Sequence, residues 1–164
     1  MSLDLFLQHL ANGLSLGSLY ALIAIGYTMV YGILLLINFA HGDIFMMATY
    51  FAFYSVVAFS LPWYWSFLVT IILTVVLGII VERLAYRPLR DAPKISILIS
   101  AIGASFLIQN LAIIFFGGRP KAFPTFKLFT EVVHLRNVSI QRLFFIIPFV
   151  TLLLLGLLIF IIME

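Results

Sequence analysis

Four long runs without a formally charged residue dominate this sequence. They cover residues 5–42, 44–81, 95–118 and 143–163. A helix needs about 20 apolar residues to cross the hydrocarbon core of a bilayer, at about 1.5 Å of rise per residue. The last two runs each match one such helix, whereas each of the first two is too long for a single crossing. The sequence therefore predicts a membrane protein with several spans.

The composition excludes the other broad classes of protein. Of the 164 residues, 65% are hydrophobic and only 9% are charged, whereas a soluble domain has about 25% charged residues. Disordered chains show the opposite balance of hydrophobicity and charge. The net charge of +3 comes from nine Lys and Arg residues spread over loops, so we expect the lipid bilayer as a partner and no nucleic acid. The sequence has no cysteine, which removes disulfides and Cys-based zinc sites.

Proline and aromatic residues divide the two longer runs. Pro62 lies among Trp and Tyr residues, which favour the membrane–water interface, and it separates a helix near 44–60 from another near 66–81. In the first run, a short segment at 3–10 precedes a helix near 14–36. We therefore predict an all-α, polytopic membrane helical bundle of about five hydrophobic helices, with a break between the first two.

The segment Ile37–Asp43 interrupts the apolar sequence between these two helices. Asn and Gly end helices and Asp is a favoured N-cap, so Asp43 is predicted to cap the second helix. The break is either a capped turn at the membrane surface or irregular backbone within the bilayer, of the kind that builds substrate sites in transporters. We expect no metal site, because no third ligand accompanies His41 and Asp43. The residues that could line a translocation path are Asn38, His41, Gly42, Asp43, Gln109 and Asn110.

Small side chains recur every four positions on two of the predicted helices. They are Gly13, Gly17 and Ala21 on the first helix and Ser96, Ser100 and Ala104 on the fourth. Small faces let helices approach closely in lipid, so we expect these faces to pack against other helices. A face that lines a path is the alternative.

Basic residues gather in two connections. The predicted loop Gly117–Arg142 holds five in 26 positions and could form a small hairpin outside the membrane or an interfacial helix. The predicted loop Glu82–Lys94 is denser in positive charge, which favours the cytoplasmic side. It directs topology or forms a docking surface for a cytoplasmic partner. Its basic residues are Arg83, Arg87, Arg90 and Lys94.

Motifs of enzymes are missing from the sequence. It has no phosphate-binding P-loop and no His-Glu-x-x-His pair. We therefore expect no catalytic residue and no cofactor. A membrane protein without its own ATPase either transports passively or uses energy supplied by another subunit.

Three blocks resemble, in order, the branched-chain amino-acid ABC transporter permeases of the LivH type. The first is Gly26–Gly32 running into Ile37–Asp43, the second is Glu82–Arg90 and the third is Leu98–Gly103. Together they extend over about residues 12–118. The resemblance implies a bacterial inner-membrane permease for leucine, isoleucine or valine that forms part of the translocation path. A passive channel, an ion-coupled carrier and a non-transporting scaffold stay open as alternatives.

The resemblance also implies partners and an incomplete chain. The partners are a second related permease, two cytoplasmic ATPase subunits that hydrolyse ATP, and a soluble substrate-binding protein. Permeases of this type are nearly twice as long as residues 1–164, which we treat as a single transmembrane permease domain, incomplete at its C-terminus. The cytoplasmic coupling segment would follow Glu164, which places Glu82–Lys94 on the cytoplasmic side and Gly117–Arg142 outside.

Overall fold

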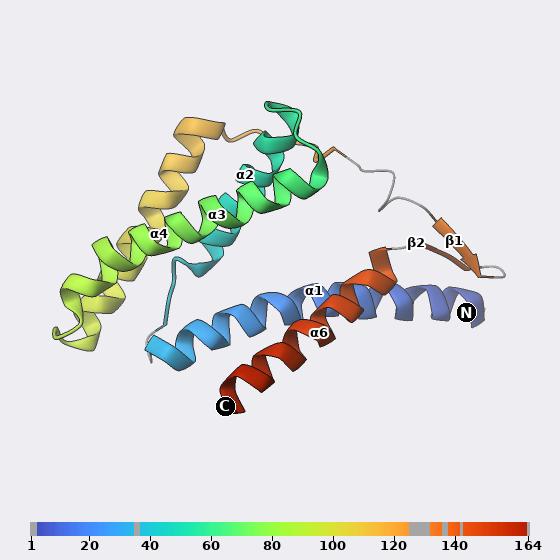
Figure 1. Cartoon of the computed structure of the whole chain (residues 1–164), viewed down its shortest axis with the longest axis horizontal. Helices are drawn as coiled ribbons and strands as arrows, with labels where there is room; N and C mark the ends of the chain where they lie inside the picture. The colour runs from blue at the N-terminus through green and yellow to red at the C-terminus, as the bar shows by residue number, and fades with distance from the viewer. Residues whose placement is uncertain (1–2, 35–36, 125–131, 136–137, 142, 164) are drawn as a thin grey trace. The chain divides into compact units, whose positions relative to one another are not determined.

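The computed structural model describes residues 3–34, 37–124, 132–135, 138–141 and 143–163 (Figure 1). Most of them are helical, and the predicted five hydrophobic helices with a break between the first two are confirmed. The α-helices are α1 (Leu3–Leu34), α2 (His41–Val57), α3 (Trp63–Val81), α4 (Lys94–Phe116) and α6 (Leu143–Met163). The chain divides into two compact units, one comprising residues 1–29 and 125–164 and the other residues 30–124.

The unit of residues 30–124 contains the end of α1, then α2, α3 and α4 (Figure 1). A π-helix, η1 (Glu82–Tyr86), and a short 3₁₀-helix, η2 (Arg87–Leu89), join α3 to α4. The buried apolar cluster lies where the start of α2 meets η1 and α4. Its members are Ala40, Val81, Tyr86, Ile97, Ala101 and Ile108.

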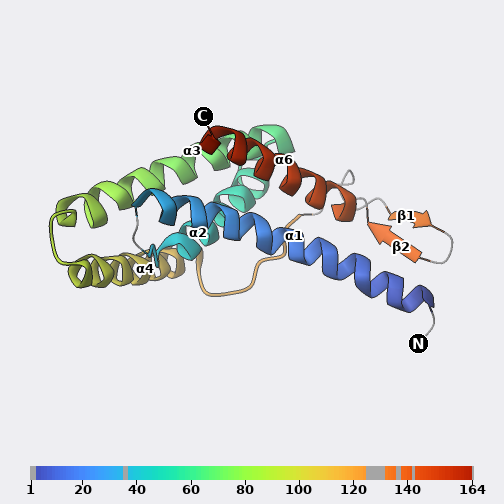
Figure 2. The same cartoon turned by 90° about the horizontal axis from the view of Figure 1, so that it is seen from below.

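The other unit consists of most of α1, a hairpin and α6 (Figure 2). Strands β1 (Val132–Leu135) and β2 (Val138–Gln141) pair antiparallel, with Val132 opposite Gln141. Of the two structures considered for this connection, the described part forms the hairpin. The buried Thr151 of α6 places its Oγ1 2.8 Å from the Ile147 carbonyl oxygen and 3.3 Å from that of Ser18 in α1.

Three stretches of the described residues are long and apolar enough to cross a membrane. They are Leu5–Gly32, Trp63–Leu89 and Lys94–Phe116, while α6 contributes the shorter apolar stretch Ile146–Phe160. Large apolar side chains lie on the helix surfaces, as Phe67 and Ile114 do. The buried cluster instead includes small residues such as Ala40 and Ala101. Surfaces of this kind suit lipid, where helices associate through close packing.

Several predicted boundaries were wrong. Residues 3–10 and the helix after them form one continuous helix, α1, because no residue between them breaks the helical hydrogen-bond ladder. Glu82–Lys94 is not simply a loop, since the chain stays helical through Leu89. Its ladder continues because the only proline there before Leu89, Pro88, follows the first residue of η2, where a missing N–H costs little.

Asp43 is not the N-cap of α2, as the sequence had suggested. Helix α2 begins at His41, and its N-cap residue, Ala40, makes no side-chain cap bond. The Ile44 amide donates to the Ala40 carbonyl oxygen at 2.9 Å, so the helical ladder has already started when Asp43 is reached. Its carboxylate is therefore free to bond to another helix.

Candidate functional site

A hydrogen-bonded polar cluster joins the first turn of α2 to α4. Ser105 Oγ donates to Asp43 Oδ2 at 2.5 Å, and Gln109 Nε2 donates to Asp43 Oδ1 at 2.9 Å. Gln109 Nε2 also lies 3.2 Å from Ser105 Oγ. The Asp43 side chain is buried, with 9% of the residue exposed. Both carboxylate oxygens thus have a donor, which offsets part of the cost of removing them from water.

This cluster lies halfway along α4. Ser105 is the central residue of Lys94–Phe116, a helix about 35 Å long at the standard rise. Further along α2, Tyr50 stacks on Phe116 at the other end of α4, with ring centroids 4.5 Å apart. The two helices therefore run in the same direction, and α2 starts near the middle of α4. The break before α2 lies at the level of the centre of a candidate membrane span.

The residues of the break are bonded to η1. Tyr86 Oη donates to Asn38 Oδ1 at 2.6 Å, and the His41 amide donates to the Asn38 carbonyl oxygen at 3.2 Å. Ala40 is fully buried between them in the apolar cluster. Irregular backbone at the depth of a span needs protein or water partners for its polar groups, and the bond from the His41 amide to the Asn38 carbonyl oxygen supplies one.

A cavity of about 310 Å³ opens beside the break. Its polar lining comes from Asn38, His41, Glu82 and Tyr86, and its apolar lining includes Ile44. The volume falls at the lower end of the range for pockets that hold small ligands. Two of the residues predicted to line a path, Asn38 and His41, thus line one cavity. Asp43, two residues after His41, bonds to Gln109 of α4 instead.

The remaining residues predicted for a path, Gly42 and Asn110, take no part in the cluster or in the lining of this cavity. Gly42 is exposed on α2, and a Cβ added there would meet no atom within 4 Å. Asn110 is also exposed and donates through Nδ2 to the Phe106 carbonyl oxygen of its own helix at 2.7 Å. Their role in a path stays a prediction: Gly42 has no side chain to contribute to the Asp43 cluster, and the structure does not bring the Asn110 side chain to it.

The two small-residue faces differ in their surroundings. Ser100 Oγ donates to the Ala85 carbonyl oxygen at 2.7 Å, which bonds α4 to the π-helix, and Ala104 packs on the buried cluster. Ser96 and Ala21 are partly buried. A Cβ at Gly13 or Gly17 would meet no described atom within 4 Å, so close packing of that face stays a prediction.

The four basic residues from the end of α3 to the start of α4 are all exposed: Arg83, Arg87, Arg90 and Lys94. Arg90 Nη2 lies 2.5 Å from Glu82 Oε1 in an ion pair. The pair is solvent-facing, with the Arg90 side chain 59% exposed, so it adds little stability. A docking role for this surface stays a prediction.

Sequence reasoning missed Ser105, Tyr86 and the pair Ser55–Ser66. Ser105 lies four residues before Gln109, so its position on the same face of α4 was available as a signal. Tyr86 was read as part of a loop, which hid its position on a helix. Ser55 of α2 and Ser66 of α3 are buried and hydrogen-bonded to each other through their hydroxyls. The spacing of these two serines in the sequence gives no sign that they are in contact.

The chemistry of the cluster suits the binding of polar groups. Within the described residues no three His, Cys, Asp or Glu side chains gather as a metal site requires. A buried carboxylate with amide and hydroxyl partners can bind a polar group, and the cavity at the break adds a mostly apolar surface with Asn38 and His41 in its lining. Intramembrane ionisable residues commonly mark the pathway of a substrate or ion.

The helices and this cluster define a multi-pass integral membrane protein with a polar break at the level of the centre of α4. A family model described as the permease component of the branched-chain amino acid transport system matches residues 9–164. The chain belongs to this family, and the resemblance inferred from its sequence blocks is confirmed. Members of the family are transport permeases.

Two curated relatives illustrate the similarity. The high-affinity branched-chain amino acid transport system permease protein BraD of Pseudomonas aeruginosa is 46% identical over 128 residues, which cover 73% of this chain and 42% of BraD. The corresponding LivH protein of Escherichia coli K12 is 40% identical over 162 residues, 90% of this chain and 53% of LivH. The chain spans about half the length of these relatives. No solved structure showed significant similarity to it.

Proposed function

We propose that the chain is part of a membrane-spanning permease subunit of an ABC importer for leucine, isoleucine or valine. The observation that carries the proposal is the polar break at the level of the centre of α4, in a chain of the branched-chain permease family. Broken helices at that level build substrate sites in transporters. In this proposal Asn38, His41 and the Asp43 cluster contribute to the translocation path.

The proposed setting is the bacterial inner membrane. A second, related permease completes the path, two cytoplasmic ATPase subunits hydrolyse ATP, and a soluble binding protein delivers the amino acid. The absence of a P-loop from this sequence supports an energy source in separate subunits. The exposed basic segment from Arg83 to Lys94 is the proposed contact for those ATPases.

Uptake by reconstituted vesicles tests this function. The natural protein that contains this chain is assembled with its partner permease, ATPases and binding protein, and labelled leucine accumulation is followed with and without ATP. We expect accumulation against a gradient only when ATP and every partner are present. The chain alone, with ATP, should accumulate no leucine. Leucine accumulation that needs no ATPase subunit would contradict the proposal.

A second candidate function is an ion-coupled carrier, because Asp43 is an ionisable residue at the level of the middle of a span. The two functions differ in their energy source. Collapse of the proton and sodium gradients abolishes uptake by an ion-coupled carrier and leaves ATP-driven uptake intact. Asp43→Asn keeps a side-chain acceptor for Gln109 and removes the charge. An ion-coupled carrier would lose coupling with this variant.

A further inference from the structure

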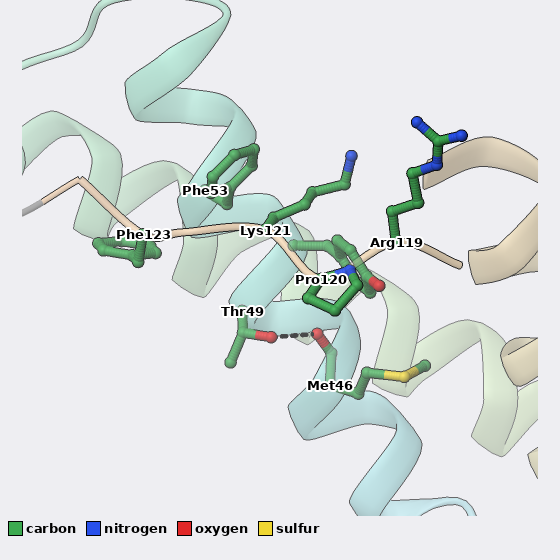
Figure 3. A pocket seen from close by; sticks show the side chains of 8 residues that line it. Met46, Thr49, Phe53, Arg119, Pro120, Lys121 and Phe123 are labelled. Carbon is green, nitrogen blue, oxygen red and sulfur yellow. Dashed lines mark hydrogen bonds between the residues drawn. The ribbon is translucent and has the colours of Figure 1, made fainter. Parts of the chain in front are cut away.

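A second cavity, of about 420 Å³, lies between α2 and the segment that follows α4 (Figure 3). Met46, Thr49, Tyr50 and Phe53 line it from α2, and Arg119, Pro120, Lys121 and Phe123 line it from the segment. Its volume is within the range of small-molecule pockets. It is distinct from the cavity at the break, because the two share no lining residue.

Aromatic rings form the apolar part of this second cavity. Tyr50 stacks on Phe116 with an interplanar angle of 11°, and Phe53 lies 6.3 Å from Phe123 between ring centroids. The Thr49 hydroxyl donates to the Met46 carbonyl oxygen at 2.7 Å, so its proton is already used within α2. The α2 side of the cavity therefore offers apolar surface and few free donors.

Two cations supply the charge. Lys121 Nζ lies 5.4 Å from the Tyr54 ring centroid and 5.9 Å from that of Phe53, which holds its ammonium beside the aromatic rings. In Figure 3 the side chains of Arg119 and Lys121 extend to the same side of their segment. No acidic side chain is among the described residues that line the cavity. An anionic group is thus favoured there, and a cationic group is not.

We propose that this cavity binds the carboxylate end of a small apolar acid, with Arg119 and Lys121 holding the carboxylate and the aromatic rings holding the apolar side chain. The inference rests on the proposed function, which makes a free branched-chain amino acid the natural ligand. The α-ammonium group of the amino acid has no carboxylate partner among the described lining residues, so it lies on the solvent side of the cavity. The basic segment Arg83–Lys94 ends at the first residue of α4, whereas Tyr50 stacks on Phe116 at its last residue. The proposed site therefore binds substrate at the end of α4 that is far from the basic segment.

Ligand analogues test the recognised group directly. Binding to the natural protein in phosphatidylcholine nanodiscs is measured by saturation-transfer NMR for leucine, leucinol and 4-methyl-2-oxopentanoate. We expect leucine and the oxo acid to bind, the oxo acid at least as tightly, because it lacks the unpaired ammonium. Leucinol lacks the carboxylate and should bind at least about tenfold more weakly. Equal binding of leucinol and leucine would overturn the proposal.

Variants locate the site. Arg119→Gln combined with Lys121→Gln should weaken leucine binding at least about tenfold. Phe53→Ala should also weaken binding, and Phe67→Ala on the exposed face of α3 is its matched control. Unchanged binding in the double variant would show that leucine is held elsewhere.

A phospholipid headgroup is the competing anion. The measurements are repeated in nanodiscs that contain phosphatidylglycerol, with the lipid ³¹P signal recorded. If leucine shows no saturation transfer in either lipid, and the ³¹P signal depends on Arg119 and Lys121, the cavity is a lipid site and the proposal is wrong. If the assembled transporter accumulates leucine with ATP while the double variant binds leucine normally, only the site is wrong. If no branched-chain amino acid accumulates, the proposed function itself fails.

Discussion

Gln109 Nε2 lies 2.9 Å from Asp43 Oδ1, and this bond fixes the first turn of α2 against the middle of α4. Helix α2 thus begins at a level where the neighbouring helix, α4, is continuous. A membrane protein that interrupts a helix at that depth must provide hydrogen-bond partners for the backbone groups that the interruption leaves free. The His41 amide donates to the Asn38 carbonyl oxygen, and side-chain bonds hold Asn38 to Tyr86 and Asp43 to α4.

Replacing Asp43 by Ala should destabilise the protein. Ser105 and Gln109 would lose their shared acceptor in a buried interface, which typically costs about 1–3 kcal/mol. The free energy of unfolding in mixed micelles measures the effect. Asn110→Ala is the matched control, because that exposed amide bonds only to its own helix and should change stability little. Equal effects of the two substitutions would show that the cluster is not stabilising.

Tyr86→Phe removes the hydroxyl that bonds to Asn38. We expect a loss of about 0.5–1.5 kcal/mol, the usual net value of such a bond, and faster amide hydrogen exchange at the break. Tyr64→Phe removes a hydroxyl from an exposed residue at the start of α3 and serves as the control. If amide exchange in residues 38–41 is the same in both variants, Tyr86 does not hold the break.

The bond between Ser55 and Ser66 should appear as a coupling between α2 and α3. Ser55→Ala and Ser66→Ala each remove one hydroxyl from the buried pair, and the double variant removes both. Hydrogen bonds between membrane helices are worth about 0.6 kcal/mol on average, so we expect a coupling free energy of about that size in a double-mutant cycle. Strictly additive effects would mean that the pair does not interact in the membrane.

The sequence predicted the helices well because segments that lie in lipid lack charged residues, so the runs without charge mark them. The helices and the break followed from where polar residues interrupt apolar ones, and the same reasoning singled out Asp43 and Gln109, which the structure brings into contact. The role of Asp43 was nevertheless misread. Asp caps helices in many proteins, but here α2 starts two residues earlier and its carboxylate bonds to α4 instead.

What could not be predicted depends on contacts between distant residues. The register of α2 along α4 is set by the Asp43 cluster and by the Tyr50–Phe116 stack, which join positions more than sixty residues apart in the chain. Helix α3 likewise continues into η1 although charged residues begin at Glu82. Ser100 of α4 bonds to the carbonyl oxygen of Ala85 there, a contact that no local pattern reveals.

The direction of α4 predicts on which side of the membrane each of its ends lies. Because the chain contains no cysteine, single cysteines can be introduced and labelled with an impermeant maleimide. Arg87 precedes α4 and Gly118 follows it, both are exposed, and one span separates them. We expect Gly118→Cys to react in spheroplasts and Arg87→Cys to react only after lysis, since the basic segment favours the cytoplasm.

Phe59→Cys extends this test to α2. Helix α2 runs in the same direction as α4, and Phe59, just after its end, is 74% exposed. It should therefore react from the same side as Gly118→Cys. Reaction of Phe59→Cys and Gly118→Cys from opposite sides would contradict the parallel register of α2 and α4, and with it the position of the break at the centre of a span. Reaction of both from inside would keep that register and reverse the orientation, because the basic segment would then lie outside.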